Sequence, residues 1–260
     1  MLEQSNLEKL KEMSIYLLEK IPIGKTDYWP AVAQHFFVDT GFYPIPDGEG
    51  GIKPGILEEG TLAYELWQED MRGRIQNATS ANQLFVMVTK PWTLTYVNLV
   101  REFLSEKDFT DFLKSAYIRT EFPNSDPNVP VDELVTCFED CNPNLLMNEE
   151  ELKVYNALPE EVTVYRGVTS NNLDGVEALS WSLSPKKAEW FATRFPSIKG
   201  RVYSATISKY DIFAYINERN EEEVIVNPDY LDDIQVYKDF TGLGSKLKTA
   251  VGRKIVDFLS

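Results

Sequence analysis

The chain has 260 residues with 26 basic and 41 acidic side chains, which gives a net charge of −15. Apolar residues make up 43% and aromatic residues 12%, so a folded core is expected and wholesale disorder is excluded. The negative charge argues against nucleic acid or an anionic membrane as the main partner. Two cysteines cannot build a disulfide scaffold, and a single histidine excludes a histidine-rich zinc site, so no metal is expected.

The N-terminal segment does not have the features of a targeting sequence. Acidic residues are spread through residues 1–20, where a targeting segment would carry a basic head followed by an apolar run. The sequence contains no stretch near the roughly 18 consecutive apolar residues of a membrane-spanning helix. We therefore expect a cytoplasmic protein without a membrane partner, and delivery of the chain into a host or target cell stays open.

The two parts of the chain differ in charge and in pattern. Residues 1–150 carry 12 basic and 25 acidic side chains, whereas residues 151–260 carry 14 and 16. Such a difference predicts two modules with different tasks. We expect a mainly helical region of unknown role over residues 1–145 and a second domain over residues 146–260.

The first part shows helical periodicity, interrupted by Gly- and Pro-rich segments. Residues 41–55 are expected to form an exposed loop, and the prolines between residues 123 and 130 break the chain again. Helices are predicted from Leu7 to just before Pro22, over Tyr28–Val38, over Ile56–Ile75, over Tyr96–Tyr117 with an interruption at residues 105–108, over Asp132–Asp140, and from Asn148 to just before Pro159.

After Pro159 the pattern is typical of β-strands. β-Branched and alternating apolar segments recur, and one helix is expected over Pro185–Phe195, with Ser184 as its N-cap. The connections are too short for repeated crossovers, so the sheet should be mainly antiparallel and the protein should belong to the α+β class. Strands are predicted at Val162–Tyr165, Val202–Ile207, Glu223–Val226 and Ile234–Tyr237.

Three short segments in this second part could carry chemistry: Tyr165-Arg166-Gly167, Ser180-Trp181-Ser182 and Glu221-Glu222-Glu223. Alternate side chains of a strand share a face, so Glu221 and Glu223 are expected to point the same way, and the two serine hydroxyls likewise. Taken singly, each segment has an ordinary structural explanation: a solvated strand end for the glutamates, a salt bridge for the arginine, and common strand residues for the serines.

Together, and in this order, the three segments resemble the R-S-E class of ADP-ribosyltransferases, which includes clostridial binary toxins and arginine-directed vertebrate ectoenzymes. The family pattern is an aromatic-Arg strand end, a Ser-x-Ser strand, and Glu-x-Glu followed by apolar residues. Here these positions read YRG, SWS and EEEVIV, and the resemblance covers residues 148–240 or so. It implies a fold of two packed, mainly antiparallel sheets with NAD between them.

The resemblance also implies a role for each matching residue. Arg166 would hold the NAD diphosphate, Ser180 would support the catalytic glutamate, Glu223 would bind the nicotinamide ribose, and Glu221 would engage an arginine acceptor. An oxocarbenium-like ribose needs a nearby anion, but the cationic nicotinamide leaves without a metal or a strong acid. The remaining residues of the NAD site would be Tyr165, Gly167, Trp181, Ser182 and Phe191.

Three aromatic residues leave alternatives open. Phe191 matches the position of the toxin aromatic that stacks on nicotinamide, yet its helical spacing with Ala188 and Ala192 favours core packing. Phe213 and Tyr215 lie in the segment that corresponds to the acceptor-recognition loop of the family. They would form either an exposed platform for a target protein or two inward residues of a strand.

We therefore expect a mono-ADP-ribosyltransferase that uses NAD as substrate and an unidentified protein as acceptor, modified at arginine. Two alternatives remain: an NAD glycohydrolase with water as acceptor, and a non-catalytic acidic interaction or inhibitor protein. Cys137, Cys141 and His35 are expected to be structural.

Overall fold

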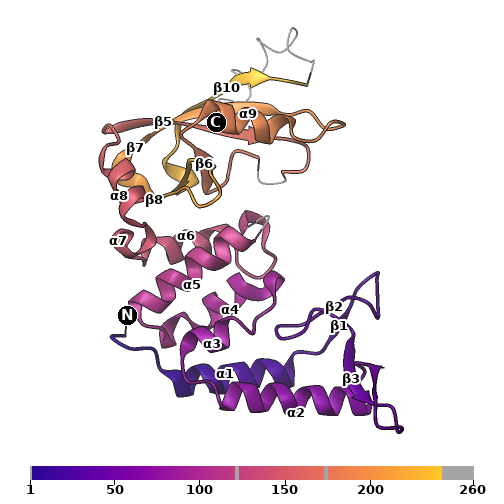
Figure 1. Cartoon of the computed structure of the whole chain (residues 1–260). Helices are drawn as coiled ribbons and strands as arrows, with labels where there is room; N and C mark the ends of the chain where they lie inside the picture. The colour runs from indigo at the N-terminus through magenta and orange to yellow at the C-terminus, as the bar shows by residue number, and fades with distance from the viewer. Residues whose placement is uncertain (1, 121–122, 173–174, 242–260) are drawn as a thin grey trace, which may run out of the picture. The chain divides into compact units, whose positions relative to one another are not determined.

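The structure, a computed structural model, describes residues 2–120, 123–172 and 175–241. The chain divides into two compact units, Met1–Val129 and Pro130–Ser260 (Figure 1). Helices occur together with antiparallel sheets, which confirms the α+β class. The boundary lies earlier than the predicted one at residue 145, because the helices that follow Pro130 pack on a strand of the second unit.

The first unit is built mainly from helices, and most of them begin at a polar N-cap. Ser105, for example, accepts a hydrogen bond from the backbone N–H of Asp108, so the predicted interruption at residues 105–108 is the start of a new helix. The helices are α1 (Leu7–Lys20), α2 (Leu62–Gln76), α3 (Ala81–Phe85), α4 (Thr93–Val100) and α5 (Glu106–Arg119), with 3₁₀ turns at Lys90–Trp92, Arg101–Phe103 and Pro123–Ser125. Their apolar faces form a core that includes Leu18, Ile75, Val97 and Leu113.

The helix predicted over Tyr28–Val38 is wrong. Residues 27–31 form turns, and β2 (Ala33–Gln34) pairs with β1 (Gly24–Lys25). Proline steers the residue before it away from the helical conformation, so Pro30 opposes a helix through Trp29.

The loop predicted over residues 41–55 is a β-hairpin. Its strands are β3 (Phe42–Pro46) and β4 (Ile52–Ile56), which pair in an antiparallel register. The Asp47 carboxylate accepts hydrogen bonds from the backbone N–H groups of Glu49 and Gly51, at 2.8 and 2.9 Å, and these bonds close the turn. The Gly and Pro content of the segment concealed this pairing.

The second unit is built on one antiparallel sheet with the strand order β10-β7-β5-β6-β9-β8. The four predicted strands are confirmed, and β6 and β8 complete the sheet. The strands are β5 (Glu161–Val168), β6 (Ser180–Ser182), β7 (Arg201–Ser208), β8 (Ile212–Ile216), β9 (Glu223–Val226) and β10 (Asp232–Asp239), with 3₁₀ turns at Lys209–Asp211 and Pro228–Tyr230.

The described residues of the second unit form four helices: α6 (Val131–Glu139), α7 (Pro143–Leu146), α8 (Glu149–Asn156) and α9 (Pro185–Thr193). The last of them contacts β5, β6 and β7. Gly167 makes this approach possible, because a Cβ there would collide with the backbone of Ala188 and Ala192. Both alanines are buried, and together with Val202 they form the core under α9.

The backbone pairing of the sheet is weakest between β5 and β6. Between β5 and β6 one residue pair is aligned, Tyr165 with Ser182, whereas β5 and β7 pair over the whole of Glu161–Val168. The two packed sheets implied by the resemblance are thus one hydrogen-bonded sheet in the described residues, divided into β10-β7-β5 and β6-β9-β8. The short length of β6 limits this pairing, and the Arg166 side chain bonds to the Ser180 carbonyl instead.

Candidate active site

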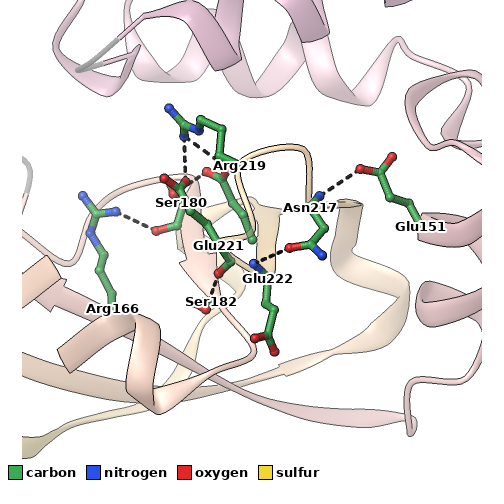
Figure 2. A network of polar contacts seen from close by, with 9 residues as sticks. Glu151, Arg166, Ser180, Ser182, Asn217, Arg219, Glu221 and Glu222 are labelled. Atoms are coloured by element: carbon green, nitrogen blue, oxygen red, sulfur yellow. Dashed lines mark hydrogen bonds and ion pairs between the residues drawn. The ribbon is translucent and has the colours of Figure 1, made fainter. Parts of the chain in front are cut away.

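A pocket of about 60 Å³ lies where β5, β6 and β9 meet α9. It brings together the three segments that the sequence singled out, although 43 positions separate Ser180 from Glu223. Figure 2 shows the polar contacts beside it. The pocket is lined by Tyr165, Arg166, Gly167, Ser180, Trp181, Ser182, Ala188, Phe191, Glu221 and Glu223, which include every residue predicted for the NAD site and for catalysis.

Glu223 is the buried carboxyl group of this pocket. It begins β9, its residue is 3% exposed, and its Oε1 accepts a hydrogen bond of 2.5 Å from the Ser180 hydroxyl. Burial raises the pKa of the Glu223 carboxyl, although the Ser180 hydrogen bond and the charge of Arg219 act in the opposite direction. The solvated strand end that the Glu-x-Glu segment alone would suggest does not apply to Glu223, because the structure encloses it almost fully.

Glu221 lies beside Glu223, but not for the predicted reason. The strand begins only at Glu223, and Glu222 between them has a positive φ of 50° in the preceding turn. The two carboxylates meet because Arg219 contacts both: its Nη2 lies 2.9 Å from Glu221 Oε2 and 3.6 Å from Glu223 Oε2. The pair is therefore bridged by a guanidinium of the same loop.

The loop that carries these residues is held from both ends. Ser182 donates a hydrogen bond of 2.8 Å to the Glu221 carbonyl, which ties the turn to β6. On the other side, Asn217 Oδ1 accepts from the Glu222 N–H at 3.0 Å, and the Asn217 N–H donates to Glu151 Oε1 at 2.8 Å (Figure 2). The loop is consequently positioned by hydrogen bonds from β6 and from α8.

Sequence reasoning missed Glu151, Asn217 and Arg219. The capping box of α8, in which the Glu151 side chain accepts from the Asn148 N–H, was a readable signal for Glu151 as a helix-start residue. The contact of Glu151 with the Asn217 N–H could not be predicted, because it depends on the position of the loop that follows β8.

Arg166 braces the wall of the pocket. Its Nε donates to the Gly175 carbonyl at 2.8 Å and its Nη1 to the Ser180 carbonyl at 2.6 Å. A planar guanidinium can hold two acceptors at once, so Arg166 fixes the segment that leads into β6. Its charge also lowers the pKa of Glu223, which places it in the electrostatic environment of the carboxylate.

Arg166→Lys should destabilise the fold. Lysine keeps the charge but lacks the fork that joins the two carbonyls, so we expect the free energy of unfolding to fall by about 1–3 kcal/mol. Denaturant titration measures this change. Arg201→Lys is the matched control, since Arg201 forms a partly exposed ion pair with Asp239 in the same sheet. Equal and small losses in both variants would contradict the bracing role.

The raised pKa of Glu223 predicts a pH-dependent stability. The folded protein keeps the Glu223 proton at pH values where the unfolded chain, with a carboxyl pKa near 4.3, has lost it. The carboxyl therefore stabilises most below its unfolded pKa, and this contribution is lost as the pH rises through the folded pKa. We expect the unfolding free energy of the wild type, relative to Glu223→Gln, to fall as the pH rises above the unfolded carboxyl pKa of about 4.3.

Denaturant titrations at several pH values measure this difference. Glu222→Gln removes a carboxylate from the same turn and should keep the wild-type pH dependence. A pH-independent difference between the wild type and Glu223→Gln would contradict the shifted titration.

The aromatic residues that line the pocket differ in their burial and in their contacts. Trp181 is 2% exposed and its Nε1 donates to the Ala178 carbonyl at 3.0 Å, so its indole belongs to the core rather than to a ligand. It alternates with the two serines and points to the other side of β6. Phe191 is half-buried at the pocket, and Tyr165 makes an edge contact with Tyr237.

The prediction that Phe213 and Tyr215 form an exposed aromatic platform is wrong. Tyr215 is 5% exposed, and Phe213 stacks on Phe138 of α6 with 6.1 Å between ring centroids. Both residues lie in β8, which packs on α7 and α8, and the backbone N–H of Tyr215 points to the sulfur of Met147. The alternative of inward strand residues is therefore the observed one.

The three residues expected to be structural are buried. His35 accepts a hydrogen bond from the Phe37 N–H through Nδ1, and its Nε2 lies 3.0 Å from the Ile21 carbonyl. Burial lowers its pKa to about 4, so the ring is neutral at physiological pH. Cys137 and Cys141 are buried and form no disulfide. Within the described ranges there is no cluster of three or more His, Cys, Asp or Glu that could hold a metal ion.

Comparisons with protein-family models, curated proteins and solved structures return no match to this chain. Among the described residues, no helix has both the length and the apolar character needed to cross a membrane. A function is therefore inferred from the residues of the pocket.

Proposed function

We propose that this protein is a mono-ADP-ribosyltransferase that transfers ADP-ribose from NAD to arginine. The observation that supports it best is the buried Glu223 carboxylate, which accepts a hydrogen bond from Ser180 and lies next to Glu221 in one pocket. Desolvation and like charge both oppose an enclosed carboxylate beside a second one, and the raised pKa of Glu223 indicates that the contacts with Ser180 and Arg219 do not fully offset them. Such arrangements are typical of catalytic sites.

Glu223 would stabilise the positive charge that develops on the ribose as nicotinamide leaves. A fixed anion in a site with little water is much more effective than one in solution, because it needs no reorganisation. Ser180 would keep the carboxylate oriented. The raised pKa means that this function improves as the pH rises and the carboxyl ionises.

Glu221 would activate the acceptor. A guanidinium has a pKa above about 12 and is a poor nucleophile until a base takes its proton. Arg219 already pairs with Glu221 at 2.9 Å, which indicates that this carboxylate accepts a guanidinium in a close contact. This favours an arginine acceptor over the hydrolytic alternative, because water needs no such partner.

Binding of NAD would require side chains at the pocket to move. Its volume of about 60 Å³ is far below the roughly 300 Å³ or more of typical ligand sites. Two side chains near the carboxylates are not enclosed: Phe191 is half-buried at the pocket, and the Arg219 side chain is 42% exposed. Arg166, which the resemblance assigns to the NAD diphosphate, would also position the wall of the site.

The proposal is tested by incubating the purified full chain with labelled NAD and agmatine, a small guanidino compound. We expect nicotinamide release together with labelled agmatine. Nicotinamide release with only free ADP-ribose would establish the NAD glycohydrolase instead. No release in any condition would contradict both and leave the non-catalytic interaction protein. Glu222→Gln serves as an active control, because its side chain points away from Ser180 and Arg219 (Figure 2).

A further inference from the structure

Arg219 occupies the position that an acceptor guanidinium would need. Its Nη2 lies 2.9 Å from Glu221 Oε2 and 3.6 Å from Glu223 Oε2. Its side chain is 42% exposed, whereas those of Glu221 and Glu223 are 22% and 5% exposed. The guanidinium therefore reaches from the surface toward the more enclosed carboxylate and contacts both carboxylates of the pocket.

The backbone holds Arg219 in this position. Asn220 and Glu222, which follow it, have positive φ values of 57° and 50°. The Asn220 N–H donates to the Asn217 carbonyl at 2.9 Å, and Asn217 is itself tied to Glu151 and to Glu222 (Figure 2). The loop thus turns tightly around Arg219, and a reaction of its guanidinium would gain from being intramolecular.

We propose that Arg219 is itself an acceptor of ADP-ribose, so that the protein modifies its own active-site loop. This inference rests on the proposed transferase activity. In the reaction, the bond between ribose C1′ and the nicotinamide nitrogen breaks, and its electron pair stays with nicotinamide. A bond forms between C1′ and a guanidinium nitrogen of Arg219. The proton of that nitrogen passes to the Glu221 carboxylate and then to solvent, while Glu223 stabilises the cationic ribose.

The geometry also predicts that the modification occurs within one molecule. Arg219 and the two carboxylates belong to the same loop and the strand that follows it, with Arg219 and Glu223 four positions apart. The rate per molecule should therefore not depend on protein concentration.

The experiment incubates the purified full chain with NAD and no other protein, and uses intact and fragment mass spectrometry. We expect one ADP-ribosyl group per chain, located on Arg219, and loss of that group in Arg219→Lys. Arg194→Lys, which changes another exposed arginine of the same unit, should be modified like the wild type. Modification of another residue, with Arg219 unmodified, would overturn the inference.

Two further measurements keep the inference separate from the proposed function. If the wild type labels agmatine but not Arg219, self-modification is refuted and the transferase proposal stands. If the wild type neither releases nicotinamide nor labels agmatine, the transferase proposal itself is refuted. Glu223→Gln mixed with the wild type should stay unmodified. Labelling of Glu223→Gln at Arg219 would show transfer between molecules and overturn the intramolecular reaction.

Discussion

Glu223→Gln should slow nicotinamide release from NAD by about 10²–10³-fold, the usual effect of removing one preorganised electrostatic partner. The amide keeps the shape of the carboxyl and can still accept the Ser180 hydrogen bond, but it carries no charge to stabilise the developing cation. The fold should survive, because the substitution removes a buried charge without leaving a cavity. Rates of nicotinamide release at saturating NAD, with melting curves for both proteins, measure the effect.

Glu222→Gln provides the matched control for Glu223→Gln. It removes the same group one residue earlier, from a side chain that does not line the pocket. We expect its rate to stay close to that of the wild type. Near-normal nicotinamide release by a well-folded Glu223→Gln protein would refute the proposed role of Glu223.

Glu221→Gln should separate transfer from cleavage. Only Glu223 is needed to break the glycosidic bond, whereas an arginine acceptor needs a base at its guanidinium. We expect transfer to agmatine to fall by about 10²-fold or more, the range of general base contributions, and nicotinamide release to fall much less. Water can still trap the cation, so the lost transfer should appear as free ADP-ribose.

The measurement for Glu221→Gln compares both products from one reaction mixture. Arg219 complicates it, because loss of Glu221 leaves the guanidinium with Glu223 as its partner within 4 Å. The double variant Glu221→Gln with Arg219→Lys removes the bidentate group and controls for this effect. Equal loss of transfer and release in both variants would assign Glu221 to the cleavage step and contradict its role as acceptor base.

Much of the second unit could be predicted because its strands carry local patterns. Val162–Tyr165 and Glu223–Val226 are apolar and β-branched, and the structure has strands at both places. The serine segment was identified through its similarity to a family pattern, and the structure places its first hydroxyl on Glu223. Local propensity and motif order were sufficient here, since neither depends on distant contacts.

The features that could not be predicted depend on contacts between segments that are far apart in the chain or on an unknown pairing partner. Arg219 lies only two residues before the Glu221-Glu222-Glu223 segment but is not part of that motif, and its position follows from bonds of the loop that reach to Glu151. Phe213 and Tyr215 could not be assigned to a surface or a core until α6 and α8 were placed on β8. The hairpin at residues 42–56 was missed because Gly and Pro suggest loops whenever the pairing partner is unknown.

The single residue pair between β5 and β6 gives the sheet a line along which it can open. The ladders of β10-β7-β5 and of β6-β9-β8 do not depend on the pair of Tyr165 and Ser182, so its loss would leave the pairing within each half intact. Besides this pair, two features link the halves: α9 contacts β5, β6 and β7, and Arg166 donates hydrogen bonds to the carbonyls of Gly175 and Ser180. An anionic ligand that competes for the Arg166 guanidinium would therefore weaken the connection between the two halves of the sheet as it binds, and would widen its own binding site.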